Sequence, residues 1–188
     1  MMSPEIVFMV EEASMEETLK ALLPRILPEG LAFRVIPHSG KSHLEASVPK
    51  KLRAWTNPNA RFVVVRDNDG GDCRRLKARL LEMCAATGRA DTLVRIVCQE
   101  LEAWFLGDLQ AVDASGLGRK LSKFQGKGLF KDPDHVEDAK GKLKELVPSY
   151  QPRSGARAIG PWMSVDKNTS QSFQAFVSGV RRIAAQLG

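Results

Sequence analysis

Four short apolar runs, each rich in β-branched residues, recur through the first 100 residues of the chain. They are EIVFMVE (5–11), LAFRVIPH (31–38), ARFVVVRD (60–67) and TLVRIVCQE (92–100). Because apolar side chains occupy nearly consecutive positions, these runs are typical of strands that are covered on both faces. Helical spacing separates them, in SMEETLKALLPRIL (14–27), KSHLEASVPKKLRAW (41–55) and CRRLKARLLEMCAATG (73–88). This alternation predicts an α/β fold with a mostly parallel four-stranded sheet flanked by helices.

The helical stretches carry both start signals and breakers. Ser14 and Glu17 fit a capping box at the start of the first helix. Pro24 is expected to end or kink that helix, and Pro49 to interrupt the second. Asp72 stands directly before the third helix, where an N-cap role explains it better than a ligand role.

The remainder of the chain has a different character. ELEAWFLGDLQAV (100–112) has a helical pattern, whereas 113–140 is rich in Gly and Lys and predicts an ordered loop or small insertion. A short helix is expected in GKLKELVP (141–148), irregular structure in 149–163 and a closing amphipathic helix in 170–188. We therefore expect an α/β core over residues 1–110 and a loop-rich and helical extension over 111–188 packed on it.

Charge and composition narrow the possible surroundings of the protein. The chain of 188 residues has a formal net charge of +6, and residues 119–188 hold 13 of its 28 Lys and Arg but only 6 of its 22 acids. A basic C-terminal third indicates either a polyanionic partner or a solvated surface. No apolar run approaches the roughly 20 residues that cross a bilayer, so we expect no membrane partner. The three cysteines lack CxxC spacing, and without a secretion signal they suggest reduced thiols in a cytoplasmic protein.

Acidic residues follow three of the four predicted strands. Because parallel strands deliver their carboxyl ends to one edge of a sheet, these acids are expected to converge there. The candidates are Glu11, Asp67, Asp69 and Glu100, with Glu12, Asp72 and Glu102 in second rank. Several carboxylates at one rim repel one another unless a cation lies among them. Oxygen ligands of this kind suit Mg²⁺ or Mn²⁺.

Simpler explanations exist for the same acids. Glu12 is consistent with a solvated residue, Glu102 with a first-turn helix acid, and DNDGG (67–71) with a turn. Arginines also lie near the strand ends, so the carboxylates alternatively form a structural ion network with Arg66, Arg74, Arg95 or Arg157.

The segment HSGKS (38–42) resembles the end of a phosphate-binding P-loop. That motif requires Gly where this chain has Val35, so a nucleoside-triphosphate fold is not expected. The segment still follows a strand and opens a helix, where backbone amides with Lys41 and Ser42 suit a phosphate. For His38 a surface or structural role is favoured, with phosphate binding as the alternative.

The order of these acids resembles the TOPRIM module of topoisomerases, primases and nucleases of the overcoming-lysogenization-defect class. More closely, PHSGKSHL, KLRAW, RFVVVRDNDGGDCRRLK, RIVCQELEAWFLGD and GARAIGPWM resemble the bacterial domain of unknown function 4276 family over nearly the whole chain. The resemblance implies a TOPRIM-like fold and often a neighbouring ATPase in a phage-defence setting. It also implies an acid/base or metal role for Glu11, Mg²⁺ binding by Asp67 and Asp69, and an added ligand in Glu100. Glu12 departs from the pattern, because the module typically has glycine there.

Two functions remain open from the sequence. The first is Mg²⁺-dependent phosphodiester chemistry on nucleic acid, with Arg153 and Arg157 among the basic residues that contact the backbone. The second is a non-catalytic accessory subunit that docks an ATPase partner or nucleic acid. A sensor of a phosphorylated ligand at residues 38–42 is a weaker third reading.

Overall fold

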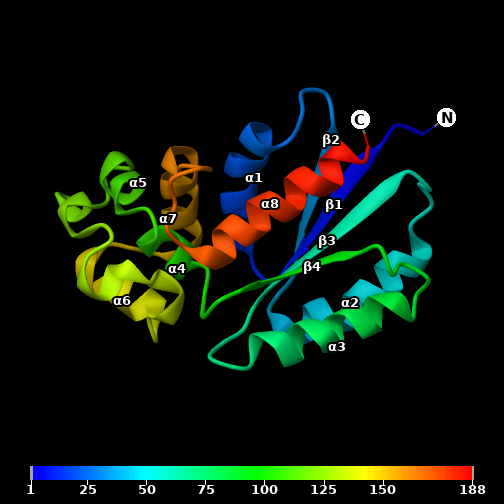
Figure 1. The fold of residues 1–188 in the computed structure, drawn as a ribbon, viewed down its shortest axis with the longest axis horizontal. Coiled ribbons are helices and arrows are strands. Elements are labelled where there is room, and N and C mark those ends of the chain that lie inside the picture. Colours follow the sequence, from blue (N-terminus) through cyan, green and yellow to red (C-terminus); the bar gives the residue numbers. More distant parts are fainter. Residues whose placement is uncertain (1, 188) are drawn as a thin grey trace.

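The computed structural model describes residues 2–187 and is built on one four-stranded sheet (Figure 1). The strands are β1 (Glu5–Val10), β2 (Ala32–Pro37), β3 (Ala60–Asp67) and β4 (Leu93–Val97). They lie in the order β2-β1-β3-β4, and every neighbouring pair is parallel. The predicted α/β fold is therefore confirmed, with a sheet that is parallel throughout.

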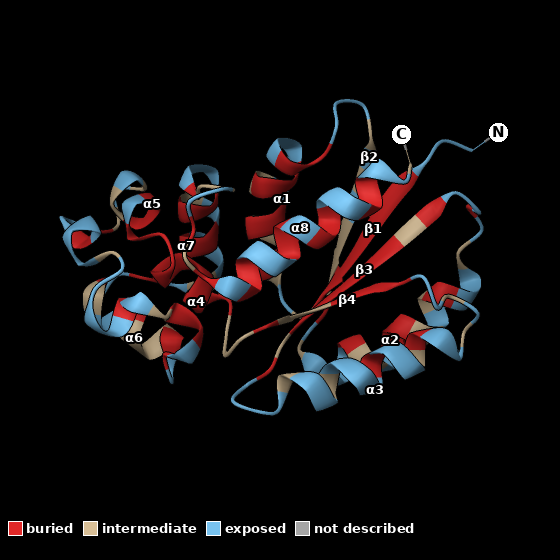
Figure 2. Ribbon diagram, in the orientation of Figure 1, coloured by how far each residue is buried: buried red, intermediate tan, exposed pale blue. Residues whose placement is uncertain are grey.

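Helices cover both faces of the sheet. In Figure 1, α2 (Lys41–Ala54) and α3 (Cys73–Ala85) lie on one face, and α1 (Ala13–Ile26) and α8 (Gln171–Ala185) on the other. All six residues of β1 are buried, as Figure 2 shows. Side chains alternate between two cores, with Phe8 in the α1 and α8 layer and Val7 in the α2 and α3 layer. The continuous apolar runs are thus explained by burial on both faces.

The remaining helices gather beyond the carboxyl ends of the strands (Figure 1). They are α4 (Glu102–Leu106), α5 (Leu109–Ala114), α6 (Ala139–Leu146) and α7 (Pro152–Ile159), joined partly by 3₁₀ turns. α7 packs against α1, and α8 returns to the sheet, where the Phe176 and Phe8 ring centroids lie 6.3 Å apart. The C-terminal third therefore both flanks the strand ends and completes the core.

Several local expectations were wrong. Residues 152–159 form a helix and not irregular structure, because Pro152 occupies a first-turn position that suits proline and Ala156 and Ile159 are buried. The N-cap of α1 is Glu12 without a side-chain cap bond, and Ser14 lies buried inside the helix, so the capping box is absent. α2 continues through Pro49, since its buried Leu44, Val48 and Leu52 hold the helix against the sheet.

The structure also bears on membrane insertion. Over residues 2–187, we find no helix with both the length and the apolar character needed to span a bilayer.

Candidate functional site

The first two predicted acids meet at the rim where β1 and β3 end. Val10 and Val65 are register partners on these neighbouring strands, which places Glu11 beside the end of β3. The Asp67 backbone N–H donates to Glu11 Oε2 at 3.3 Å. Parallel pairing alone therefore brings together two acids that are 56 residues apart in the sequence.

Asp67 is the most perturbed carboxyl of this rim. Burial, followed by the charges of Glu11 and Glu102, raises its pKa well above the ordinary value. The Leu101 N–H donates to Asp67 Oδ2 at 3.3 Å and partly offsets this effect. Asp69 adds a further like charge. Glu11, Asp67 and Asp69, hereafter the rim carboxylates, therefore influence one another electrostatically.

The pKa of Glu11 is raised as well. Burial and then the Asp69 charge raise its pKa, whereas Arg66 opposes the rise. The Arg66 guanidinium does not pair with the rim, because its Nε lies 3.1 Å from Glu45 Oε1. Its Nη1 donates to the Asp67 carbonyl oxygen, a backbone acceptor, at 2.6 Å.

The segment 38–42 borders the rim carboxylates. The Gly40 N–H donates to the Glu11 carbonyl oxygen at 3.0 Å, and Lys41 Nζ lies 3.1 Å from Asp69 Oδ2. Ser42 is exposed in the first turn of α2. His38 instead is buried, and its Nδ1 lies 2.8 Å from the Val10 carbonyl oxygen. Lys41 is thus the member of this segment that contacts an acid of the site.

Glu100 and Glu102 face the C-terminal helices. The Lys140 N–H donates to Glu100 Oε2 at 2.9 Å, and the ammonium lies 3.9 Å from Glu100 Oε1. Burial raises the pKa of Glu102, whose Oε1 accepts from the Tyr150 hydroxyl at 2.8 Å. Although burial opposes it, the charges of Glu102 and Glu100 raise the pKa of Lys140. Lys140 and Tyr150 are site neighbours that sequence reasoning missed.

The other predicted residues lie in different surroundings. Asp72 accepts from the N–H groups of Arg74 and Arg75 and is the expected N-cap of α3. Glu12 is exposed and lines a small hollow with Glu11 and Asp67.

Arg153 and Arg157 both bind Glu17 of α1, with nitrogen–oxygen distances of 3.1 and 2.7 Å. These two ion pairs join α7 to α1. The arginine side chains stay largely exposed, whereas the Glu17 side chain is 12% exposed.

The proposed arginine network does not form around the rim. Arg66 pairs with Glu45 and Arg157 with Glu17, while Arg95 Nε donates to the Ala175 carbonyl oxygen at 2.9 Å. Within residues 2–187, no ion pair joins an arginine to a rim carboxylate.

The donor set suits a hard divalent cation, because it consists of carboxylate oxygens that remain without arginine partners. The positions of these side chains are not those of a pre-formed metal site. Across the described chain, no three His, Cys, Asp or Glu side chains are already arranged as a metal cluster. The oxygens therefore fit Mg²⁺ or Mn²⁺ by chemistry and would have to turn toward a bound ion.

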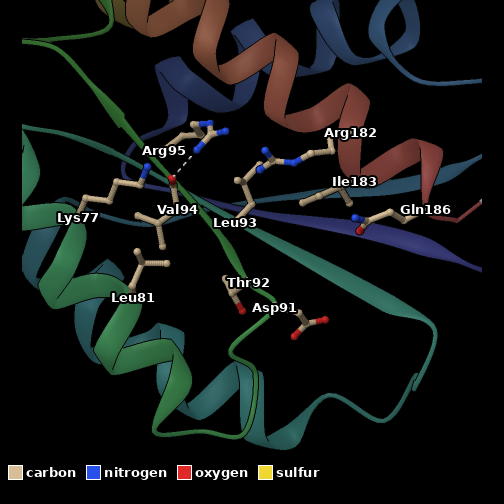
Figure 3. Close-up of a pocket in the computed structure, with 10 residues that line it drawn as sticks. All are labelled: Lys77, Leu81, Asp91, Thr92, Leu93, Val94, Arg95, Arg182, Ile183 and Gln186. Carbon is tan, nitrogen blue, oxygen red and sulfur yellow. Dashed lines mark hydrogen bonds between the residues drawn. The ribbon is translucent and has the colours of Figure 1, made fainter.

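A separate hollow of about 380 Å³ lies along β4 (Figure 3). Lys77 and Leu81 of α3 line one side, and Arg182 and Ile183 of α8 line the other. The Arg95 side chain reaches back and donates to the Val94 carbonyl oxygen at 3.2 Å. None of the rim carboxylates borders this hollow, so it is distinct from the site.

The fold makes this an α/β protein with a parallel sheet, and acids gather at the carboxyl ends of its strands. The chain belongs to the family described as Domain of unknown function (DUF4276), whose model matches residues 10–181. A search of curated proteins found no match.

Among solved structures, the chain resembles the C-terminal regions of OLD proteins. The region from Burkholderia pseudomallei is 18% identical, with full coverage of both chains and a TM-score of 0.58. That from Xanthomonas campestris pv. campestris is 17% identical, with 98% of this chain and 97% of that chain covered and a TM-score of 0.51. At such identities the likeness shows a shared fold.

Proposed function

We propose that this protein carries out divalent-metal-dependent phosphodiester chemistry on nucleic acid at the rim carboxylates. The observation that supports this most is the convergence of Glu11, Asp67 and Asp69, with raised pKa values for Glu11 and Asp67. Within residues 2–187, none of the three forms an ion pair with an arginine. Such a cluster gains stability when a cation enters it. The OLD-like fold is a supporting analogy.

The metal would be held by Asp67 and Asp69, with Glu11 or Glu100 as further oxygen ligands. When bound, Mg²⁺ or Mn²⁺ supplies positive charge that offsets the negative charge developing on a phosphate. Glu11 is suited to proton transfer, because its raised pKa brings its protonation closer to neutral pH. Lys41 and Lys140 flank the acids and are placed to attract the phosphate backbone.

The basic extension supplies a further contact surface for nucleic acid. Between residues 119 and 131 the chain has five basic residues, namely Arg119, Lys120, Lys123, Lys127 and Lys131. Phe124 remains 40% exposed, and Lys123 Nζ lies 4.7 Å from its ring centroid. Aromatic and basic side chains together suit contacts with bases and phosphates.

A cleavage assay tests this proposal directly. Purified protein is incubated with single-stranded DNA, duplex DNA and RNA in Mg²⁺, Mn²⁺ or EDTA. We expect metal-dependent cleavage of at least one substrate, a loss of at least 100-fold in Asp67→Asn and retention in the surface control Asp91→Asn. Cleavage that persists in EDTA, or in Asp67→Asn, would contradict the assignment.

The second candidate is a non-catalytic accessory subunit. It is favoured by one observation, namely that the described residues contain no pre-arranged metal cluster. Salt-sensitive nucleic-acid binding without cleavage, unchanged in Asp67→Asn, would support this function over the first.

A further inference from the structure

Two cysteines lie in contact beyond the carboxyl ends of β3 and β4. Cys73 is the first residue of α3, and Cys98 directly follows β4. Their Sγ atoms are 3.5 Å apart although 25 residues separate them in the sequence. The third cysteine, Cys84, is buried within α3 and belongs to the core beneath the sheet.

Asn68 holds this pair in place. Its Nδ2 donates to Cys73 Sγ at 3.0 Å and to the Gly71 carbonyl oxygen at 2.8 Å. Its Oδ1 accepts from the Gln99 N–H at 2.6 Å. One buried side chain therefore fixes the segment that carries Cys73 and the segment that carries Cys98 relative to each other.

Both thiols are reachable from solvent. Each cysteine is half-buried, and the two line a cavity of about 480 Å³ together with Arg74, Lys77 and Arg95. This cavity adjoins the hollow of Figure 3, with which it shares Lys77 and Arg95. The cavity gives a small oxidant access to the sulfur atoms.

We propose that Cys73 and Cys98 form a reversible oxidation site that closes to a disulfide when the protein meets a hydroperoxide. Burial raises the pKa of Cys98, so Cys73 supplies the thiolate. The Cys73 thiolate attacks a peroxide oxygen, the O–O bond breaks, and a sulfenic acid forms on Cys73 as hydroxide leaves and takes up a proton as water. The second sulfur then attacks the sulfenic sulfur, loses its proton and expels a second water. In sum, two thiols are oxidised by two electrons and one hydrogen peroxide is reduced to two waters.

The disulfide would tie together two segments of the rim. The sulfur atoms need to approach only to bonding distance, about 2.05 Å. Asp69 lies in the segment from β3 to Cys73, and Glu100 lies two residues after Cys98. Oxidation would therefore cross-link the segment after β3 that carries Asp69 to the segment after β4 that carries Glu100. This inference rests on the thiol geometry and is independent of the proposed function.

Peptide mapping of the wild-type full chain tests the proposal. The protein is treated with hydrogen peroxide, blocked with N-ethylmaleimide and digested with trypsin without reduction. We expect peptides 67–74 and 96–119 to appear linked, with a mass two hydrogen atoms below the sum of the two peptides. Cys84 in peptide 80–89 should be alkylated. Dithiothreitol should restore three alkylated thiols.

Two variants sharpen the result. In Cys98→Ser, peroxide should leave a sulfenic acid on Cys73 that dimedone labels, whereas Cys84→Ala should still form the link. The wild-type map does not depend on whether Cys84→Ala folds. Three alkylated cysteines after peroxide treatment, or a disulfide that includes Cys84, would overturn the proposal.

Discussion

At the scale of single residues, the protonation of the site depends on which charges lie beside each carboxyl. Burial, followed by the charges of neighbouring acids, raises the pKa values of Asp67 and Glu11. Glu17 is bound by two arginines, and its pKa is lowered to about 2. Neighbouring charge thus separates acids that repel one another from acids that stabilise the fold.

Asp67→Asn should stabilise the metal-free protein. Because the folded pKa of Asp67 lies above its ordinary value of 3.8, wild-type stability falls as the pH rises from that value through the folded pKa. The amide removes this loss and still accepts from the Leu101 N–H. We expect a melting temperature about 2–4 °C higher at pH 8, the shift that about 1 kcal/mol produces in a domain of this size.

Differential scanning calorimetry checks this expectation, with Asp91→Asn as the surface control. A lower melting temperature in Asp67→Asn would show that Asp67 serves a stabilising ion network.

Tyr150→Phe should destabilise the fold. The substitution removes the donor to the Glu102 carboxylate, which is 2% exposed, and leaves that oxygen without its partner. Losing a buried hydrogen bond to a charged group costs about 1.5–3 kcal/mol. Urea unfolding measures the loss. Glu102→Gln keeps an acceptor for Tyr150 and should cost less, so equal losses in the two variants would contradict this explanation.

At the scale of secondary-structure elements, the C-terminal helices share an apolar core with α1 and the sheet, and a few polar contacts add to it. Glu17 of α1 binds both arginines of α7, and Lys140 of α6 binds Glu100 after β4. Close packing adds to these contacts, since Gly155 of α7 lies against the Tyr150 ring. The position of α6 and α7 beside the strand ends depends on these contacts.

The ion pair between α1 and α7 predicts a specific acid sensitivity. Because the folded pKa of Glu17 lies below its ordinary value of 4.5, its stabilising contribution is present above pH 4.5 and is lost as the pH falls toward about 2. Glu17→Gln should be slightly less stable at pH 7 and should lose this part of the acid dependence. Thermal melts at pH values between 2 and 7 compare the two proteins. Parallel stability curves would refute the assignment.

Gly155→Ala should destabilise the protein although alanine favours helices. A methyl group at this position meets the Tyr150 ring, whose residue is only 1% exposed and has little room to move. Overpacking of this kind costs about 1–3 kcal/mol. Ser154→Ala on the exposed side of α7 serves as the matched control and should change stability little. Chemical denaturation distinguishes the two, and a Gly155→Ala protein as stable as wild type would be inconsistent with the packing.

At the scale of the whole molecule, the sequence was most informative where local pattern determines structure. The apolar runs and their alternation with helices predicted the sheet, because parallel strands buried on both faces must be apolar throughout. The same topology explains why Glu11 and Asp67 meet. Lys140 and Tyr150 were not predictable, since no local signal connects them to acids 40 and 48 residues earlier. α7 was missed because its Gly and Pro residues resemble a loop.

Binding of divalent metal tests the central claim most directly. Mn²⁺ and Mg²⁺ are titrated calorimetrically into wild type, Asp67→Asn, Glu11→Gln and the control Asp91→Asn. The account predicts saturable binding to wild type and to the control, with binding abolished in Asp67→Asn and weakened in Glu11→Gln. Wild-type protein that binds neither metal, or Asp67→Asn that binds as tightly as wild type, would contradict it.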